Sequence, residues 1–377
     1  MTDPVRTIKW VQNGFTLTYF NNKPFFIHGA LPDEIIHFEI IKENKHHGFG
    51  IVKKIIQKNP LRKKIDCPIF PLCGGCSYRH IDYKEEIALK IELLKEFSEI
   101  KPYLETGQFD YYFSPEYKYR NQVKIHYLNQ KYGFFRLYSN IIVPFSEEGC
   151  YNLPEKLNEY IKKQNNPSNK LKEKKIFYIN NNIIENQTFN IKLMPEVEWE
   201  ISTDCFLQTN RFLLREWLDW IKNKVLLLTQ KSKVNVLELF CGTGIISSYF
   251  LNYLNSIEGY ESNSISLKFA KLNYKKYHIK NQFIYKDLYS NGVNIKNNQY
   301  DIIIINPPRK GIGKKLIQSL ENCNIPMIYS SCNPATFNRD IQILKKTGYK
   351  IKHFAIFDFF PRTYHVEIVA TLVKNKC

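Results

Sequence analysis

From Val234 to the end of the chain, short apolar runs alternate with helix-like segments, and this alternation constrains the fold more than any other feature. The apolar runs are VNVLELF, IEGYE, NQFIYKD, YDIIIIN and IPMIYSS, and segments such as 264–277 and 335–348 separate them. Strands that alternate with helices form a doubly wound parallel sheet, which binds ligands at the carboxyl ends of its strands. We therefore predict a Rossmann-like domain over residues 205–377, ending in an antiparallel hairpin near 351–357 and 365–373.

The preceding residues predict two further domains, so the whole chain is expected to be a multidomain α/β protein. Residues 1–60 contain FTLTYF, PFFIHGA, EIIHFEII and FGIVKKII, separated by turn signals, which is typical of a small antiparallel β-barrel. Residues 61–204 are rich in strand patterns and form a central domain. Within it, the capping-box spacing of Asp82 and Glu85 predicts a helix from Ile81 to about Ile100.

The high positive charge of the chain has two possible explanations. The 377 residues carry 54 basic and 36 acidic side chains, a formal net charge of +18. One explanation is a biased, Lys-rich composition that forms a solvated face; the other is a polyanionic partner such as nucleic acid. No apolar run approaches the roughly 20 residues of a membrane span, and the N-terminus lacks a signal peptide. We therefore expect a cytoplasmic protein with no membrane partner, and a monomer.

A cysteine motif indicates a metal or cluster site. The chain has nine cysteines, an odd number that does not favour a disulfide framework. Three of them, Cys67, Cys73 and Cys76, lie close together in CPIFPLCGGCSYRH, and Cys150 is the best candidate for a fourth ligand. Zinc remains an alternative, but the uneven spacing suits an iron–sulfur cluster better.

A second group of residues predicts a cofactor site at the carboxyl ends of the strands. Glu238 ends the first strand, and Gly242 and Gly244 follow it where a helix begins, so a cofactor could approach the backbone. Glu261 ends the next strand, where a carboxylate can accept both hydroxyl protons of a ribose, and Asp287 ends the third. This pattern fits S-adenosylmethionine better than a nicotinamide cofactor.

The last motifs predict the reacting groups. Asn306, in IIIINPPRKG, can hydrogen-bond a base, whereas Arg309 stands where amino-group methyltransferases carry an aromatic residue. Cys332 follows a strand and precedes a helix, so a helix dipole and nearby cations would lower the pKa of its thiol and make it a nucleophile. Glu367 is a candidate general base, and His365 would share its strand face.

Together these residues resemble the RumA/TrmA family of RNA (uracil-5-)-methyltransferases over nearly the whole chain. FFIHGALPDEII resembles part of the family's TRAM domain, an OB-like RNA-binding barrel, and CPIFPLCGGCSYRHIDY with Cys150 resembles the [4Fe–4S] site of RumA (RlmD)-type members. YRNQVKI and CFLQTN resemble two further family segments, and SCNPAT and FPRTYHVE resemble the nucleophile and base segments. One departure is Asn306, where the family usually has Asp.

The resemblance implies methylation of uridine carbon 5 in RNA, with 23S rRNA as the first candidate substrate. It also implies S-adenosylmethionine and a [4Fe–4S] cluster as cofactors. Cys332 would add to carbon 6 of uracil, and Glu367 would remove the proton from carbon 5. It also implies that the segment 81–108 packs with the catalytic domain. The alternatives are the same reaction on tRNA, an amino-group methyltransferase, and a non-catalytic RNA-binding iron–sulfur protein. The predicted cofactor-binding residues are Gln208, Glu238, Gly242, Gly244, Glu261, Asp287 and Asn306.

Overall fold

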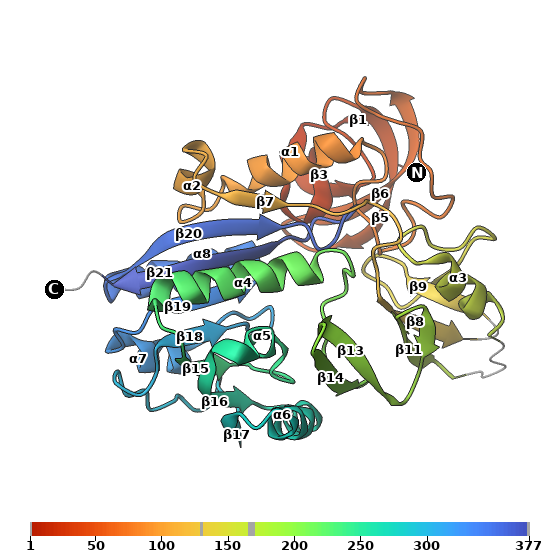
Figure 1. The fold of residues 1–377 in the computed structure, drawn as a ribbon. Coiled ribbons are helices and arrows are strands. Elements are labelled where there is room, and N and C mark those ends of the chain that lie inside the picture. Colours follow the sequence, from red (N-terminus) through yellow and green to blue (C-terminus); the bar gives the residue numbers. More distant parts are fainter. Residues whose placement is uncertain (1, 129–130, 165–169, 375–377) are drawn as a thin grey trace. The chain divides into compact units, whose positions relative to one another are not determined.

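The computed structural model describes residues 2–128, 131–164 and 170–374 (Figure 1). Contacts group the chain into two compact units. Unit 1 contains residues 1–94, 115–176 and 360–365, and unit 2 contains 95–114, 177–359 and 366–377. The sequence predicts three domains, over residues 1–60, 61–204 and 205–377. A domain is a part that folds on its own, whereas these two units are defined by contacts, so the three domains stay a prediction. Among the described residues, no helix is both long and apolar enough to cross a bilayer.

Unit 1 begins with a six-stranded sheet in the order β1-β5-β6-β4-β3-β2. Every second residue of its strands points into the core, as expected from the alternation of side chains along a strand. Phe25 and Ile27 of β4 and Ile36 and Phe38 of β5 are all buried there. The two edge strands, β1 and β2, are consecutive in the chain, so one segment pairs with both ends of the sheet. The strands are β1 (Val5–Arg6), β2 (Lys9–Val11), β3 (Phe15–Phe20), β4 (Lys23–His28), β5 (Ile35–Glu43) and β6 (Gly48–Gln57), with a 3-10 turn at Gln12–Gly14.

The prediction of a purely antiparallel sheet at the N-terminus was wrong in one respect. Strands β4 and β6 pair in parallel, with Phe25 beside Gly48 and His28 beside Ile51, whereas the other pairs are antiparallel. The reason is that β5 lies between β4 and β6 in the chain. Because β5 runs antiparallel to β6, the chain has reversed its direction before β6, and β6 runs in the same direction as β4. The N-terminal strands are red to orange in Figure 1.

The rest of unit 1 contains helix α1 and the strands around the cysteine motif. The predicted helix from Ile81 to about Ile100 is shorter than expected: α1 spans Tyr83–Leu94, and a separate short helix, α2 (Lys101–Glu105), belongs to unit 2. Pro102 lies in the first turn of α2, a position that tolerates a missing N–H, whereas Pro inside a continuous helix would break it. The other elements are β8 (Gln122–Leu128), β9 (Lys131–Phe135), β10 (Ile142–Pro144), α3 (Glu155–Lys162) and β11 (Lys172–Ile179), which crosses into unit 2.

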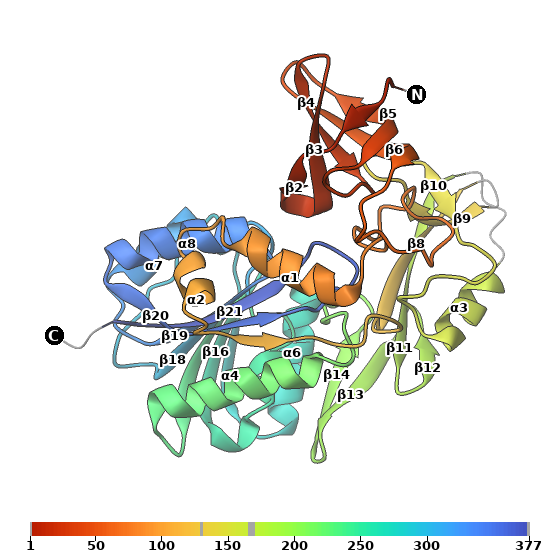
Figure 2. The same cartoon turned by 90° about the horizontal axis from the view of Figure 1, so that it is seen from above.

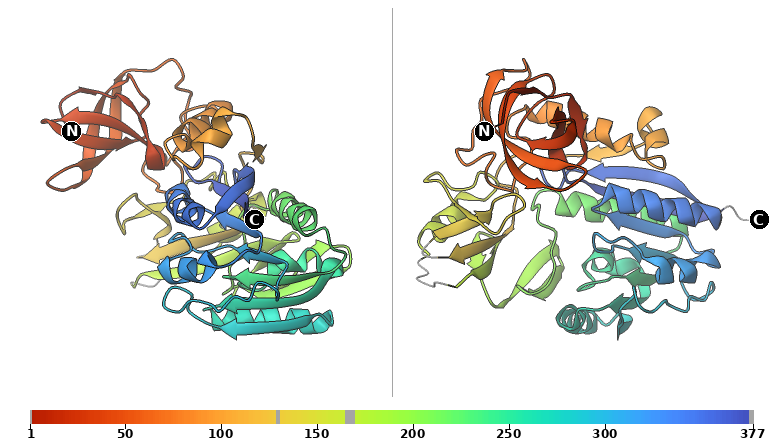
Figure 3. Two further views of the ribbon diagram at one scale, coloured as in Figure 1. Left: turned by 90° about the vertical axis from the view of Figure 1, so that its left-hand side faces the viewer. Right: turned by 180° about the vertical axis from the view of Figure 1, so that it is seen from behind.

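Unit 2 is built on an eight-stranded sheet in the order β17-β16-β15-β18-β19-β21-β20-β7. The first five of these strands are parallel to one another, and β21 is antiparallel to β19 and β20, so the predicted doubly wound sheet and terminal hairpin are confirmed. Figures 2 and 3 show helix α4 on one face of the sheet and α7 with α8 on the other. All four residues of β18, Ile302–Ile305, are buried, as expected for a strand covered on both faces.

The strands of this sheet are β7 (Asp110–Tyr112), β15 (Val234–Leu239), β16 (Leu254–Glu261), β17 (Lys280–Tyr285), β18 (Ile302–Ile305), β19 (Met327–Ser331), β20 (Tyr349–Phe357) and β21 (Glu367–Lys374). The helices are α4 (Leu214–Thr229), α5 (Ile245–Ser248), α6 (Ser264–Lys276), α7 (Lys314–Glu321) and α8 (Pro334–Lys346), with a 3-10 turn at Leu251–Tyr253. Strands β12 (Asn182–Ile184), β13 (Thr188–Met194) and β14 (Val197–Ser202) complete the unit, and β13 pairs with β14.

Candidate active site and cysteine site

Strand register brings most of the predicted cofactor residues to one edge of the unit 2 sheet. Leu239 at the end of β15 pairs with Tyr260 of β16 and with Ile305 of β18, so the three strands end at the same level. Glu261 and Asn306 follow these paired positions directly, and Asp287 lies just beyond the end of β17. Gln208 belongs to no strand, so the register does not place it on this edge; it is buried in the segment before α4.

The two glycines after β15 have different roles in the turn. Both have positive φ, +55° at Gly242 and +72° at Gly244. A Cβ on Gly244 would come within 2.6 Å of the Tyr274 ring, whereas a Cβ on Gly242 would meet nothing within 4 Å. Gly244 is therefore needed for packing, and Gly242 leaves open space beside the backbone. The helix predicted to begin here, α5, has only four residues.

The carboxylates at this edge are held in three different ways. Glu238 is buried, which raises its pKa to about 7, and Ser247 Oγ donates a hydrogen bond to its Oε2. Among the described residues, Oε1 of Glu238 has no hydrogen-bond partner. Glu261 accepts hydrogen bonds from the backbone N–H groups of Ser262 and Asn263, at 2.7 and 2.8 Å, and from that of Gly242, at 3.1 Å. An orphaned acceptor, a fixed carboxylate and an open glycine turn are together suited to a polar cofactor.

Asp287, the third carboxylate, is exposed at the end of β17. Its carboxylate accepts hydrogen bonds from the hydroxyl of Ser290 at 2.6 Å and the backbone N–H of Tyr289 at 2.9 Å. These bonds hold its pKa below the ordinary value for Asp, so the group is a fixed anion at neutral pH.

Cys332 follows the end of β19 directly, and Glu367 is the first residue of the neighbouring strand β21. Strands β19 and β21 pair antiparallel, and their last pair is Ser331 beside Ile368. Glu367 is buried, which raises its pKa to about 7, although a 2.5 Å hydrogen bond from Ser330 Oγ opposes the rise. Trp217 Nε1 donates to the same Ser330 hydroxyl at 3.3 Å. A buried carboxyl with this pKa can exchange a proton near neutrality.

The expected low pKa of the Cys332 thiol was wrong. The pKa of this thiol is raised to about 11, first because the thiol is largely buried and then because the charge of Glu367 lies nearby. The positive charge of Arg309 and a hydrogen bond from that side chain lower the pKa, but they do not offset burial. Asn333 Nδ2 donates to the carbonyl oxygen of Arg309 at 3.1 Å, which ties the Arg309 loop to the residue after the cysteine.

The predicted shared strand face of His365 and Glu367 was also wrong. Strand β21 begins at Glu367, and the preceding residues Phe360–His365 belong to unit 1. In unit 1 this segment is fixed by Arg362, which is fully buried and donates to the carbonyl oxygen of Ile81 at 2.8 Å. Glu86 Oε1 accepts a hydrogen bond of 2.7 Å from the backbone N–H of Arg362. No local sequence pattern predicts that Arg362 is buried in this way.

The four predicted cluster cysteines line a single cavity in unit 1. Cys67, Cys73, Cys76 and Cys150 border a space of about 310 Å³ together with Arg79, Arg120 and Lys124. Cys76 Sγ accepts hydrogen bonds from Arg79 Nε at 3.4 Å and Asn152 Nδ2 at 3.3 Å. Burial, followed by the proximity of Cys76, raises the pKa of Cys150 to about 11.

The eight cysteines in the described part of the chain form no disulfide bonds with one another. As these side chains are placed, no three His, Cys, Asp or Glu side chains within residues 2–128, 131–164 and 170–374 form a set that could hold a metal ion.

Comparisons with known proteins show which families the chain is similar to. Residues 285–375 match the model of the tRNA (uracil-5-)-methyltransferase family, and residues 223–321 match the methyltransferase small domain. An uncharacterized RNA methyltransferase of Leptospira interrogans is 30% identical, with 97% of this chain and 93% of the relative covered. The 23S rRNA (uracil(1939)-C(5))-methyltransferase RlmD of Histophilus somni is 28% identical, with 96% and 94% covered.

A solved structure extends the likeness to the whole fold. The tRNA (uracil-54, C5)-methyltransferase of Pyrococcus abyssi, in complex with S-adenosyl-L-homocysteine, covers 98% of this chain at a TM-score of 0.74 and 20% identity; 99% of that chain is covered. The chain therefore belongs to the RNA methyltransferase family. Within it the chain is an RNA uracil-5-methyltransferase, whose reaction is the S-adenosylmethionine-dependent methylation of uracil carbon 5 in RNA.

Proposed function

We propose that this chain methylates carbon 5 of a uridine in 23S rRNA through a covalent adduct on Cys332, with Glu367 as the general base. The observation that supports the proposal is the register of β19 and β21, whose last pair, Ser331 and Ile368, is followed by Cys332 on one strand and preceded by Glu367 on the other; the charge of Glu367 acts on the thiol, and burial raises the pKa of Glu367 to about 7. The H. somni relative, named for 23S rRNA, supports the substrate, and the P. abyssi neighbour, named for tRNA, makes tRNA the second candidate. A TRAM-like fold of residues 1–60 would supply the RNA-binding barrel.

The steps follow from what each side chain can do. Cys332 first loses its thiol proton to solvent, and the thiolate then adds to carbon 6 of uracil, so a C–S bond forms and carbon 5 becomes enolate-like and nucleophilic. S-adenosylmethionine supplies the methyl group. Glu367 then removes the proton from carbon 5, and the C–S bond breaks to release Cys332. Arg309 favours the thiolate, because its charge lowers the pKa of Cys332. The uridine must leave its stack to reach the thiol, which suits loops or distorted RNA.

The cofactor residues are proposed on the geometry of the sheet edge. Glu261, held by three backbone N–H groups, would accept the ribose hydroxyls, and Asp287 would orient the adenine. The open space beside Gly242 would admit the cofactor, and the free Oε1 of Glu238 would accept one of its donors. Gln208, Gly244 and Asn306 complete the proposed set. Asn306 keeps an acceptor oxygen but lacks the charge of the family's usual Asp.

Trapping the adduct tests the mechanism. The Glu367→Gln protein, mixed with S-adenosylmethionine and a 23S rRNA fragment, should form a protein–RNA band that survives denaturing electrophoresis, because the base needed to release Cys332 is missing. Adding Cys332→Ala to this variant should remove the band, and Cys323→Ala, a buried cysteine after α7, is the matched control. Methyl transfer by Cys332→Ala alone would instead support an amino-group methyltransferase.

The substrate is tested separately from the mechanism. Mass spectrometry of 23S rRNA and tRNA from a deletion strain should show 5-methyluridine missing from 23S rRNA. Loss from tRNA instead would leave the mechanism intact and replace the substrate. If the purified protein binds RNA but transfers no labelled methyl group to any RNA, the non-catalytic alternative replaces the enzyme.

We also propose that Cys67, Cys73, Cys76 and Cys150 hold a [4Fe–4S] cluster. All four thiols border one cavity of about 310 Å³, which supports the proposal, and their sulfurs would have to move from their present positions to bind the cluster. A single zinc ion would bind each sulfur at a Zn–S distance of about 2.3 Å, so four sulfurs around zinc would enclose less space than this cavity offers. The positive charges of Arg79, Arg120 and Lys124 at the same cavity would offset the charge of the thiolates.

Anaerobically purified protein should absorb broadly near about 400 nm, as iron–sulfur charge transfer does. Cys73→Ser should remove this absorbance, whereas Cys323→Ser should keep it. A colourless protein with one equivalent of zinc would overturn the cluster.

A further inference from the structure

One face of the N-terminal sheet carries two aromatic rings and a lysine in a single cross-strand row. Phe26 of β4 pairs with Phe49 of β6, and Phe49 pairs in turn with Lys42 of β5. Residues directly opposite each other on neighbouring strands point to the same face of a sheet. The rings of Phe26 and Phe49 are half-buried, with centroids 5.4 Å apart, and Lys42 is exposed. The row thus presents flat apolar surface beside a positive charge.

A loop of the cysteine-containing part of unit 1 adds a fourth side chain to this row. Tyr138, between β9 and β10, is 49% exposed, and its ring centroid lies 4.7 Å from that of Phe49. Lys42 Nζ lies 5.5 Å from the centre of the same Tyr138 ring. The backbone of Tyr138 is left-handed, with φ +54°, a conformation that is an outlier for a bulky residue and is frequent at functional sites. We call Phe26, Phe49, Tyr138 and Lys42 the aromatic row.

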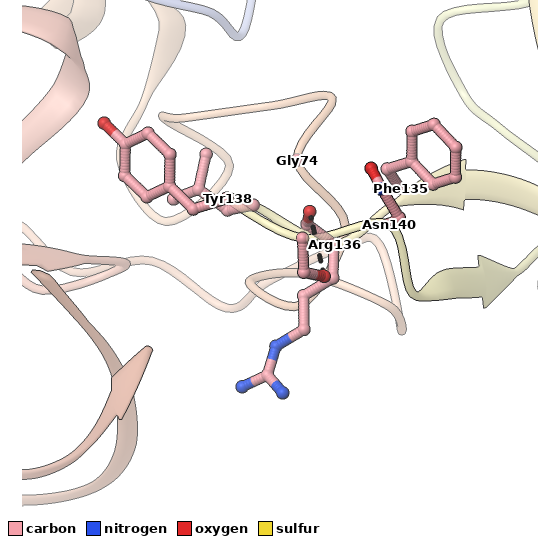
Figure 4. A pocket seen from close by; sticks show the side chains of 7 residues that line it. Gly74, Phe135, Arg136, Tyr138 and Asn140 are labelled. Atoms are coloured by element: carbon pink, nitrogen blue, oxygen red, sulfur yellow. Dashed lines mark hydrogen bonds between the residues drawn. The ribbon is translucent and has the colours of Figure 1, made fainter. Parts of the chain in front are cut away.

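The loop that carries Tyr138 also borders an open hollow of about 490 Å³, lined by residues 135–140 and Gly74 (Figure 4). Figure 4 shows the side chains of Tyr138 and Arg136 extending from this loop in different directions. Arg136 is paired with Glu39 at 2.7 Å, so Lys42 is the cation that accompanies the rings of the row. At the other end, Tyr138 lies close enough to Tyr364 for their hydroxyls to interact electrostatically.

We propose that the aromatic row binds unpaired bases of the RNA strand that carries the target uridine. This inference rests on the proposed function for the identity of the ligand as RNA. Bases stack on aromatic faces without regard to sequence, and a cation beside the rings pairs with the phosphates between the bases. The formal net charge of +18 suits a polyanion.

The test is a binding measurement that does not depend on methyl transfer. Fluorescence anisotropy of the full chain would be measured with a single-stranded oligoribonucleotide and with the same sequence as a duplex. Tyr138→Ala should weaken single-strand binding about tenfold and leave duplex binding unchanged, because only unpaired bases can stack. Tyr138→Phe should bind normally, since it keeps the ring. Tyr19→Ala is the matched control, because Tyr19 is 55% exposed on β3 of the same sheet but lies outside the row.

The possible outcomes separate this inference from the proposed function. Normal single-strand binding by Tyr138→Ala, or an equal loss on duplex, would overturn the stacking role. Tyr138-dependent binding of vesicles with an anionic lipid surface, without binding of RNA, would also overturn it. If the wild type transfers no methyl group but shows the Tyr138-dependent preference for single strands, the row stands and the proposed activity fails. Far-UV circular dichroism of each variant would confirm that its fold is unchanged.

Discussion

Replacing Glu367 with Gln should stabilise the protein, and the gain should depend on pH. The side chain is 2% exposed, and burial raises its pKa from 4.5 to about 7. Because the folded pKa lies above the unfolded one, folding favours the protonated acid. The stabilisation from this group is complete below about pH 4.5 and is lost as the pH rises through about 7. Glutamine is neutral at every pH and keeps an oxygen that can accept the hydrogen bond from Ser330.

The size of the effect follows from the shift in pKa. At about 1.4 kcal/mol per pKa unit, the buried charge costs the wild type about 3 kcal/mol at pH 8. At pH 5, where the folded group is protonated and the unfolded group is only partly ionised, the cost is about 1 kcal/mol or less. Glu367→Gln should therefore raise the free energy of unfolding by about 3 kcal/mol at pH 8 and by much less at pH 5.

Urea unfolding followed by tryptophan fluorescence would measure the difference. Trp199, Trp217 and Trp220 are buried in unit 2, so the signal reports mainly the unit that contains Glu367. Glu196→Gln, at an exposed turn of the same unit, is the control and should change little at either pH. An equal gain at both pH values would refute the reasoning, because it would mean that Glu367 titrates as an ordinary carboxyl.

Two further predictions follow from neighbouring contacts. Ser330→Ala should move the rising limb of the pH profile of kcat/KM to higher pH, because the lost hydrogen bond is the contact that lowers the pKa of Glu367; an unchanged profile would argue against Glu367 as the base. Gly244→Ala should destabilise the protein by about 1–3 kcal/mol, because the new Cβ would come within 2.6 Å of the Tyr274 ring at a positive φ. Thermal unfolding would measure this loss, and Gly107→Ala, whose Cβ would meet nothing within 4 Å at a similar positive φ, separates the steric effect from the backbone strain.

Local pattern predicted the sheet edge well, because each strand there is a short apolar run that ends in a polar residue. The runs ending at Glu261, Asn306 and Cys332 needed only the general rule that parallel strands end together. The same pattern could not give the length of the first helix, which ends at Leu94 and is followed by a separate helix that begins at Lys101. Nor could it predict the parallel pairing of β4 and β6, which depends on where β5 crosses the sheet.

The electrostatics of the site depended on contacts between distant parts of the chain. The sequence placed Cys332 between a strand and a helix, which suggested a low pKa, but desolvation and Glu367 raise it. Ser330 and Trp217, which fix the carboxyl, lie 37 and 150 residues before Glu367 and carry no motif of their own. Arg362 likewise fixes the segment before Glu367 through contacts with Ile81 and Glu86, which lie 281 and 276 residues earlier in the chain.

The sequence by itself determined the order of the strands along the chain, the family likeness and the identity of the candidate reacting groups, because apolar periodicity and short motifs are local properties. Tertiary structure decided which of those groups meet and what their protonation states are. Burial sets the pKa of Glu238 and Glu367, and burial is produced by residues that are far apart in the chain. The aromatic row was equally invisible in the sequence, because Tyr138 and Phe49 are far apart in the chain and are brought together by the packing of two different sheets.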